Sequence, residues 1–536
     1  MWVVQVYGVP MVQVTITNKP VRELRAEGYV FFVSPDGGHH DPTSAEVALS
    51  RAVIPADVQV PTDIGALLKK TGWRAGSGTV GEVMGLRDGK PVYLFYVGLA
   101  AASVDKADRI EFYRCGIAKI VRLCERLKIT QLALDLPDPV LLGVDECDCG
   151  KETVATIIMA SYQFNQFITD PARHLPQEYE LTLSVSEPLH EALQVGVEYG
   201  QRIGHAVNQA RQWCDLPADT LTPVEFGKCI QSVVHGHDGL TCQLFNRKEI
   251  EALGMEGLAG VAKGSQHEPR FVVIEYASPH PNAPRIGLVG KGVTFDSGGL
   301  SIKPSACMDE MKDDMAGAAA VAATMQAIAH LKPHVNVVAC MAIAENLPSG
   351  TAMKPGDILR HYNGVTSEVK NTDAEGRLII ADALAYIVDK YKLNALVDLA
   401  TLTGACSHAL GPFFAGIMTK NHGLQEQLLR AGRTSGDWLW PLPFHDNYKP
   451  AVASDVADVC NIGKSQYRAG AITAGFFLEH FVGDVPWAHL DIAGVSFNVP
   501  DKAYFRPGAT GFGVRLLIEL LMRWHHENGN TIEKRG

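Results

Sequence analysis

Long apolar runs are missing from this sequence of 536 residues. No stretch approaches the roughly 18 apolar residues that a membrane-spanning helix requires. Met1–Val6 lacks the basic start of a secretory signal and is predicted to form a β-strand. These absences exclude a membrane-spanning protein and, together with the cysteine pattern, predict a cytoplasmic location.

Paired cysteines of the metal-binding or redox type are also missing. The eleven cysteines are scattered and none belongs to a Cys-x-x-Cys pair, so reduced thiols are expected instead of a disulfide framework. Cys147 and Cys149 lie close together but lack a second half of a soft metal site. We therefore predict that they occupy a surface loop.

Basic residues are fewer than acidic ones, with 48 lysines and arginines against 59 aspartates and glutamates. The formal net charge is −11 and the isoelectric point is about 5.9, so a basic face that binds nucleic acid nonspecifically is not favoured. Hydrophobic residues make up 46% of the chain and charged residues 20%, which excludes disorder as the main state. We expect a small-molecule partner instead.

Four familiar motifs are incomplete. Residues 290–303 are rich in glycine but satisfy neither the phosphate-loop nor the dinucleotide-binding pattern. Ser297 does not lie in Gly-x-Ser-x-Gly, so a serine nucleophile elbow is unsupported. His190 and Glu191 begin a His-Glu-x-x-His motif, but the second histidine is absent. Phosphate binding, serine chemistry and a two-histidine zinc site are therefore not favoured.

The pattern of apolar residues predicts an α/β protein. The length suggests two to four domains. Residues 1–186 mix short strand-like runs with helical patterns and are predicted to form a smaller N-terminal α/β domain. Helical spacing across 187–214 predicts a linking helix. Residues 215–536 are predicted to form a larger C-terminal domain, in which helices flank a central, mostly parallel sheet.

Buried-strand runs in the C-terminal part direct the search for a site. The clearest are Phe271–Tyr276, Ile286–Val289, Val335–Ile343 and Ala395–Leu399. In parallel sheets, ligands bind at the loops beyond the carboxyl ends of the strands. Candidate functional residues should therefore lie in the segments that follow these runs.

One such segment is Asn371–Leu378, which holds Asp373, Glu375 and Arg377 within five positions. The apolar residues after it have helical spacing, so the segment is predicted to begin a helix. Acids at a helix N-terminus can be simple capping residues, and that alternative stands for this segment alone. Arg377 opposes the helix dipole, which suggests a bound anion or a nearby carboxylate.

Two other loops supply acids. Asp296 lies in the glycine-rich loop, and Asp313 and Asp314 precede an alanine-rich helix predicted at Met315–His330. Either of the latter two could be the N-cap of that helix. Carboxylates without paired histidines nevertheless suit hard or borderline divalent cations.

A charge count supports a metal site. Two divalent cations carry a charge of +4, which four carboxylates neutralise. The four candidates are Asp296, Asp314, Asp373 and Glu375. Lys303 and Arg377 then remain as cations that could face a developing oxyanion. A lysine beside two dications readily loses its proton, so Lys291 could act as a neutral amine ligand.

Two long segments resemble the leucyl aminopeptidase (cytosol aminopeptidase) family. One is Val289–Gly299 and the other is Asn371–Leu378. The likeness extends through residues 344–346, 353–357, 398–405 and 487–494, and covers roughly residues 205–525. Both central motifs are long and specific, so the resemblance implies a two-metal exopeptidase that acts on peptide substrates.

The resemblance also implies a ligand set. Lys291, Asp296, Asp314 and Glu375 would hold the tighter metal, and Asp296, Asp373 and Glu375 the more exchangeable one. Zinc is expected, and manganese, magnesium or cobalt could replace it at the second site. Lys303 would polarise the scissile carbonyl, and Arg377 would bind a bicarbonate that serves as general base. The nucleophile would be a water that bridges the two metals.

Further positions match the family's substrate pocket. They are Met311, Thr401, Leu402, Gly404 and Ala405, with Ala509 as an additional candidate. Methionine and small residues suit an apolar N-terminal residue such as leucine, although they could equally be core packing. Such pockets separate similar side chains by only about 1–3 kcal/mol, so broad specificity is expected. Family members are usually hexamers, which implies a homohexamer.

Two alternative functions remain open from the sequence. Some bacterial relatives also bind DNA as regulatory proteins, although the acidic balance of this chain argues against that role. Specialised hydrolysis of cysteinylglycine is the second alternative. The first 200 residues match the family poorly, so the sequence assigns no role to the N-terminal domain.

Overall fold

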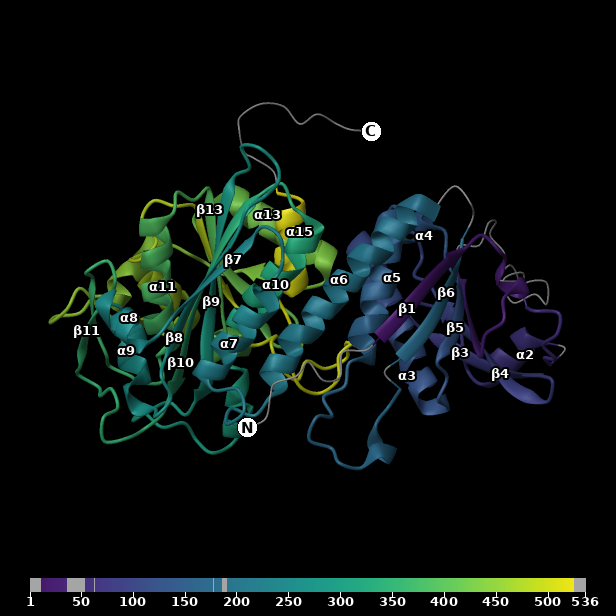
Figure 1. Cartoon of the computed structure of the whole chain (residues 1–536), viewed down its shortest axis with the longest axis horizontal. Helices are drawn as coiled ribbons and strands as arrows, with labels where there is room; N and C mark the ends of the chain where they lie inside the picture. The colour runs from purple at the N-terminus through teal and green to yellow at the C-terminus, as the bar shows by residue number, and fades with distance from the viewer. Residues whose placement is uncertain (1–10, 36–53, 62, 177, 186–189, 525–536) are drawn as a thin grey trace. The chain divides into compact units, whose positions relative to one another are not determined.

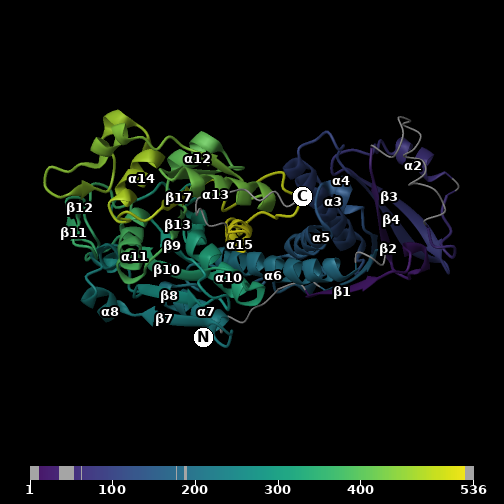
Figure 2. The ribbon, with the colours of Figure 1, turned by 90° about the horizontal axis from the view of Figure 1, so that it is seen from above.

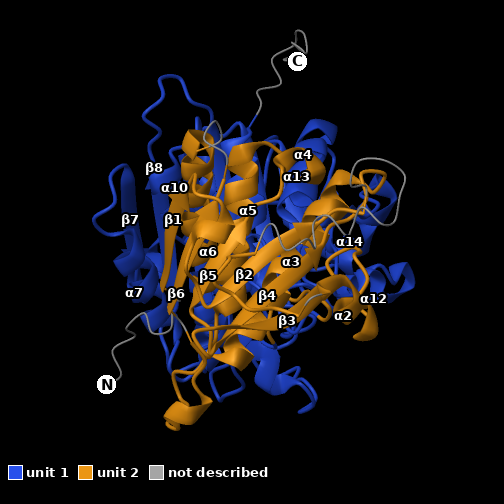
Figure 3. Ribbon diagram, turned by 90° about the vertical axis from the view of Figure 1, so that its right-hand side faces the viewer, with its two compact units in different colours: residues 1–2, 209–499, 507–536 blue, residues 3–208, 500–506 orange. Residues whose placement is uncertain are grey.

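The computed structural model describes residues 11–35, 54–61, 63–176, 178–185 and 190–524. The strand predicted at Met1–Val6 lies outside these ranges. The chain forms two compact units, coloured separately in Figure 3. One comprises residues 1–2, 209–499 and 507–536, and the other comprises residues 3–208 and 500–506. The division falls inside helix α6 (His190–Asp215), and the domain boundaries inferred from sequence stay a prediction.

The N-terminal unit contains a six-stranded sheet in the order β1-β6-β5-β2-β4-β3. The strands are β1 (Met11–Thr17), β2 (Gly28–Val33), β3 (Val80–Arg87), β4 (Lys90–Gly98), β5 (Gln131–Asp135) and β6 (Glu178–Ser184). Its helices include α2 (Ile64–Lys70), α3 (Lys106–Leu127), α4 (Pro139–Leu142) and α5 (Glu146–Ser161). All neighbouring pairs are parallel except β3 with β4. The predicted smaller α/β fold is confirmed.

Helix α5 corrects the surface-loop prediction for the two close cysteines. The side chain of Asp145 accepts a hydrogen bond from the amide of Asp148 at 2.7 Å and caps the helix there. Cys147 and Cys149 therefore lie in the first turns of α5, and Cys149 is only 1% exposed. The prediction was wrong because the cap starts the helix before its apolar periodicity begins.

The C-terminal unit is built on an eight-stranded sheet in the order β15-β14-β17-β13-β9-β10-β8-β7. The strands are β7 (Leu240–Phe245), β8 (Arg270–Tyr276), β9 (Arg285–Asp296), β10 (Asn336–Asn346), β13 (Ala395–Ala400), β14 (Ala415–Thr419), β15 (Leu439–Pro441) and β17 (Trp487–Asp491). The four central strands are parallel, whereas β14 with β17, β10 with β8 and β8 with β7 are antiparallel. The sheet is thus mixed, with the predicted parallel arrangement at its centre.

Helices cover both faces of this sheet, as Figures 1 and 2 show for α10 and α11. They are α7 (Pro223–Val234), α8 (Arg247–Ala252), α9 (Glu256–Val261), α10 (Ala316–Leu331), α11 (Gly376–Lys390), α12 (Gly404–Leu410), α13 (His422–Ser435), α14 (Gly470–Glu479) and α15 (Val514–Met522). A small sheet of β11 (Ile358–Arg360), β12 (Thr366–Glu368) and β16 (Val459–Cys460) completes the unit. No helix in the described residues is long and apolar enough to cross a membrane.

Small residues bring α10 close to the central strands. A Cβ added at Gly290 of β9 would lie 2.6 Å from Cα of Ala318, and one added at Gly317 would collide with the carbonyl oxygen of Leu399. Alanine and glycine at this contact therefore let the helix backbone approach the sheet closely. Because Asp314 lies two residues before α10, this contact sets the depth at which its carboxylate lies.

The four parallel strands end at one edge of the sheet. Their last residues are Asp296, Asn346, Ala400 and Asp491. Carboxyl ends of parallel strands are the usual place for a ligand site. The fold therefore brings together loops that are far apart in the sequence.

Candidate active site

Three carboxylates meet at this edge. Asp296, Asp314 and Glu375 each offer one oxygen, and these oxygens lie within 4.8 Å of one another. Their residues are 2%, 7% and 1% exposed. Within the described residues this is the group of acids close enough to share a metal ion. Three separate segments of the sequence thus form one candidate metal centre.

Asp296 is held by polar neighbours on both sides. Its Oδ1 accepts hydrogen bonds from the amide of Gly298 at 2.9 Å and from Nδ2 of Asn346 at 2.8 Å. Nδ2 of Asn346 also donates to the carbonyl oxygen of Thr372 at 3.0 Å. The amide of Asn346 therefore ties the end of β9 to the segment that carries Asp373 and Glu375.

Asp314 points into the site and does not cap α10. Its Oδ1 accepts hydrogen bonds from Nζ of Lys291 at 2.6 Å and from Oγ1 of Thr401 at 2.8 Å, while its buried Oδ2 has no partner in the described chain. The N-cap of α10 is Met315, which makes no side-chain capping bond. Asp313 instead accepts a hydrogen bond from Ser496. The capping alternative for these two acids is wrong.

Glu375 likewise faces the site. It precedes α11 in a helical backbone conformation (φ −81°, ψ −35°) and makes no side-chain capping bond. An N-cap side chain normally reaches back to the helix from an extended backbone, so this conformation directs the carboxylate elsewhere. Its Oε1 lies 3.0 Å from Nζ of Lys291, and its buried Oε2 has no partner among the described residues. The capping alternative therefore fails for Glu375 too.

Lys291 lies at the centre of the carboxylates. Its Nζ donates to Asp314 and, at 2.8 Å, to the carbonyl oxygen of Thr401. Burial lowers the pKa of Lys291, but Asp314, Glu375 and Asp296 together raise it by more, so the net shift is upward. The pKa values of Asp314 and Glu375 are raised, mainly by burial. The ammonium group of Lys291 thus neutralises part of the buried negative charge.

Lys303 joins a second pair of acids. Its Nζ lies 2.7 Å from Oδ2 of Asp296 and 2.5 Å from Oδ1 of Asp373. The side chains of Lys303 and Asp373 are 22% and 32% exposed, so this pair lies nearer to solvent than Lys291. The structure therefore places one lysine deep in the site and one at its entrance.

Arg377 is buried at the start of α11 and is 7% exposed. In the part of the chain that the structure describes, its guanidinium makes no hydrogen bond or ion pair, and Nε is fully buried. Burial lowers the pKa of Arg377 to about 10, although Glu375 and Asp491 oppose that shift. A buried charge without a partner is costly, so this geometry favours a bound anion.

Of the predicted substrate-pocket residues, Thr401 contacts the deep lysine through its carbonyl oxygen. Thr401 and Leu402 follow β13, and Met311 lies in the short 3-10 helix Met308–Asp313. Gly404 and Ala405 begin α12 and are exposed. The additional candidate Ala509 is 1% exposed and its amide donates to Asp215.

Asn461 is a site residue that the sequence did not reveal. Its Nδ2 donates to the carbonyl oxygens of Asn371 and Ala374 at 2.6 and 3.2 Å, and its Oδ1 accepts from the amide of Lys370 at 2.8 Å. The side chain is fully buried. It holds the loop before Glu375 from about 90 residues away, and no local pattern marks it.

Asp491 supports the loop on the other side. Its Oδ1 accepts from the amide of Leu402 at 3.2 Å, and its Oδ2 accepts from Oγ1 of Thr403 at 2.6 Å. Asp491 lies within the segment 487–494 whose likeness to the family was noted from sequence. That likeness was the available signal for its importance.

Buried carboxylates around a lysine, at the carboxyl edge of a parallel sheet, are typical of an α/β metal-dependent enzyme. Comparison with known proteins specifies the family. Residues 208–518 match the model described as the catalytic domain of the cytosol aminopeptidase family, and the chain belongs to this family. It is therefore a metal-dependent aminopeptidase, and the family and enzyme class inferred from sequence are confirmed.

Individual relatives of this chain support the same family. A probable cytosol aminopeptidase of Desulforapulum autotrophicum is 42% identical over 417 residues, which cover 77% of this chain and 79% of the relative. One from Geotalea uraniireducens is 44% identical over 380 residues, covering 70% and 76%. Among solved structures, the bottromycin maturation enzyme BotP in complex with Mn has a TM-score of 0.78 and 32% identity, covering 93% of this chain and 99% of that one.

Proposed function

We propose that this enzyme removes an apolar N-terminal residue, such as leucine, from peptides with the help of two divalent metal ions. The observation that carries the proposal is the trio of buried carboxylate oxygens within 4.8 Å of one another. Oδ2 of Asp314 and Oε2 of Glu375 are buried without partners in the described residues, which suits a bound cation.

Membership of the family and the cluster of Asp296, Asp314 and Glu375 together support an assignment of residues to each ion. Lys291, Asp296, Asp314 and Glu375 would bind the tighter metal, and Asp296, Asp373 and Glu375 the more exchangeable one. Oxygen-rich donors with one amine suit zinc, manganese, magnesium or cobalt, and the similar enzyme BotP was solved with Mn. When bound, the ions would supply positive charge and a bridging water of lowered pKa.

Lys291 must change its protonation state to join this set. An ammonium group has no lone pair, so its amine can bind a metal only after losing the proton that it now shares with Asp314 and Glu375. Positive charge at the centre would drive that loss, because it replaces the ammonium as the counter-charge to the acids.

Lys303 is placed to polarise the scissile carbonyl. It is the partly exposed cation of the site and lies between Asp296 and Asp373. A charged donor at the entrance can approach the carbonyl oxygen of a peptide and stabilise negative charge as it develops. Its present carboxylate partners would then be free to bind metal.

Arg377 would hold a bicarbonate as general base. Its guanidinium is buried and unpartnered in the described chain, and its planar donors match a carboxylate-like anion in a bidentate arrangement. An anion held there would accept the proton of the attacking water.

The first residue of the substrate would lie against Met311, Thr401, Leu402, Gly404 and Ala405. Thr401 ties this wall to the centre, because its hydroxyl and carbonyl contact Asp314 and Lys291. Small residues at the start of α12 leave room for an aliphatic side chain. A homohexamer, a cytoplasmic location and the lack of nucleic-acid binding stay predictions.

A substrate panel with metal analysis tests the proposal. We expect the protein loaded with zinc or manganese to contain two ions per chain and to cleave leucine amide. N-acetyl-leucine amide should resist cleavage, because its amine is blocked. Equal cleavage of both compounds would contradict the proposed exopeptidase action. Including cysteinylglycine in the panel separates general trimming of peptides from the specialised alternative.

A further inference from the structure

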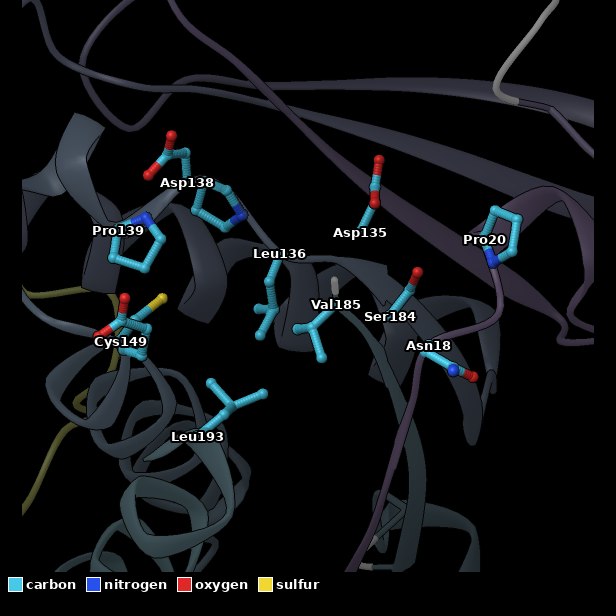
Figure 4. A pocket seen from close by; sticks show the side chains of 12 residues that line it. Asn18, Pro20, Asp135, Leu136, Asp138, Pro139, Cys149, Ser184, Val185 and Leu193 are labelled. Atoms are coloured by element: carbon cyan, nitrogen blue, oxygen red, sulfur yellow. The ribbon is translucent and has the colours of Figure 1, made fainter. Parts of the chain in front are cut away.

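A cavity of about 580 Å³ lies in the N-terminal unit. Its lining includes Asp135, Leu136, Asp138, Glu146, Val185 and Leu193, all labelled in Figure 4 except Glu146. It lies where the parallel strands β1, β5 and β6 end at Thr17, Asp135 and Ser184. Both the volume and the position are typical of small-molecule sites.

The described lining of the cavity is acidic. Asp135, Asp138 and Glu146 are acidic, and the described residues around the cavity include no lysine, arginine or histidine. The structure shows no hydrogen bond or ion pair from another described residue to the side chain of Asp135 or Glu146. Burial raises the pKa of Asp135. A carboxylate at this depth would be stabilised by a cation, since none is supplied by the lining.

The arrangement disfavours a metal ion and an anion. Within the described chain the acids close enough to share a metal are Asp296, Asp314 and Glu375, so those around this cavity are too dispersed. The helix N-termini nearby are already occupied, because Asp138 accepts from the amide of Val140 at 3.0 Å in α4. Asp145 accepts a hydrogen bond from the amide of Asp148 at the N-terminus of α5. An anion would meet these carboxylates instead of free amides.

The remaining wall is apolar. Figure 4 shows Leu136, Val185 and Leu193 grouped between the polar residues of the cavity. Leu193 is 2% exposed and Cys149 is 1% exposed, so this wall belongs to the packed interior of the unit. A ligand that fills the space must therefore bring apolar surface as well as positive charge.

We propose that this cavity binds an organic ammonium ion with an aliphatic body. The ammonium group lies against Asp135, and the body packs on Leu136, Val185 and Leu193. The chemistry is shared by free aliphatic amines and by the amino ends of apolar peptides. The site is separate from the residues of the aminopeptidase centre and does not depend on the function proposed for it.

Three probes of one shape test the charge requirement. They are 3-methylbutylamine, 3-methylbutanol and 3-methylbutanoate, each titrated into the full-length, metal-loaded protein by equilibrium dialysis. Leucine amide is compared with 3-methylbutylamine in the Lys303→Ala variant, because this variant is expected to cleave leucine amide only slowly. We expect the amine to bind at least tenfold more tightly than the alcohol, and the carboxylate not to bind. Equal or tighter binding of the carboxylate would overturn the proposal.

Variants locate the binding. Asp135→Asn keeps the shape but removes the charge, and we expect it to weaken amine binding at least tenfold. Leu193→Phe fills the cavity and should abolish binding, with thermal melting to show that the fold is kept. Asp63→Asn is the matched control, because Asp63 is an exposed capping acid elsewhere in the same unit. Wild-type affinity in Asp135→Asn would show that the amine binds only elsewhere, and would refute the site.

In the Lys303→Ala background, leucine amide that binds more tightly than 3-methylbutylamine, and loses that binding when Asp135→Asn is added, would identify peptide amino ends as the natural class. The reverse order would identify free amines. These assays measure binding and not hydrolysis, so they remain informative even if the proposed peptide cleavage fails.

Discussion

Arg377 shows how a single residue can indicate a missing partner. Its guanidinium is buried, has no partner among the described residues, and lies at a helix N-terminus where the dipole also disfavours a cation. Three unfavourable features at one position are better explained by a bound anion than by packing. The proposed bicarbonate supplies the charge that the protein itself does not.

Replacing Arg377 should therefore reduce turnover and leave the metals in place. We expect Arg377→Ala to lower kcat by about 10²–10³-fold, the range seen when a group that stabilises developing charge is lost. Turnover of the wild-type enzyme should rise with added bicarbonate, whereas the variant should not respond. Arg360→Ala, which removes an exposed arginine of β11, is the control. A variant that still responds to bicarbonate would show that the anion binds elsewhere.

Lys303 makes a separate prediction at the same scale. Lys303→Ala should lower kcat by about 10²–10³-fold through loss of the donor to the carbonyl. Metal content, measured by mass spectrometry, should stay near two ions per chain. Lys354→Ala removes a lysine that is 64% exposed and should behave as wild type. Loss of metal in Lys303→Ala would mean that this lysine supports the metal site instead of the substrate.

At the scale of elements, the close contact of α10 with the sheet positions the acids. The helix approaches β9 and β13 only because Gly290 and Gly317 have no side chains. Asp314 lies at the end of this helix that faces the site, so a change in the contact is transmitted to the metal ligands. Close packing of this kind is intolerant of even one added methyl group.

We expect Gly317→Ala to destabilise the protein by about 1–3 kcal/mol, because the added Cβ would collide with the backbone of Leu399. Metal affinity should fall at the same time. Gly350→Ala is a matched control, since a Cβ there meets nothing within 4 Å. Denaturant unfolding and metal titration measure the two effects. Unchanged stability in Gly317→Ala would show that the helix can shift without cost.

The neighbouring strands β13 and β17 are joined by buried polar side chains. Oδ1 of Asp398 lies 2.6 Å from Nδ1 of His489, and its Oδ2 accepts from Nε1 of Trp487 at 2.7 Å. Asp398 and His489 are fully buried. Removing the acid would leave two buried donors without an acceptor.

Asp398→Ala should therefore destabilise the fold by about 2–5 kcal/mol, as expected for breaking a buried hydrogen-bonded pair. Asp455→Ala, at an exposed position of the same unit, should change stability by less than about 0.5 kcal/mol. Thermal unfolding of both variants compares the losses. A small loss for Asp398→Ala would indicate that water replaces the carboxylate.

At the scale of the molecule, metal binding should be coupled to stability. The site buries carboxylates whose charge Lys291 and Lys303 only partly neutralise. Ions that bind only the folded chain stabilise it, by about 2.7 kcal/mol at 100 times the dissociation constant. We expect chelation to abolish activity and to lower the melting temperature, and zinc or manganese to restore both. Activity that survives complete chelation would contradict the metal centre.

Much of the fold could be predicted from local patterns. Apolar runs marked β8, β10 and β13, and local sequence patterns marked α10 and α11, because side-chain periodicity reflects which face of an element is buried. The antiparallel edges of the large sheet were not predicted, since strand direction depends on pairing partners and not on composition. The predicted position of Cys149 was wrong because the capping acid Asp145 begins helix α5 where the apolar pattern is weak.

The sequence by itself determined the kinds of residue in the site, because metal chemistry needs acids and the long motifs preserve them. Only the tertiary structure decided that Asp296, Asp314 and Glu375 converge on Lys291, and that these acids do not cap their helices. It also revealed the hydrogen bonds by which Asn461 holds the loop before Glu375, and the acidic cavity beside Asp135. The physical reason is that the packing of parallel strands brings distant loops to one edge, and no local pattern encodes such distances.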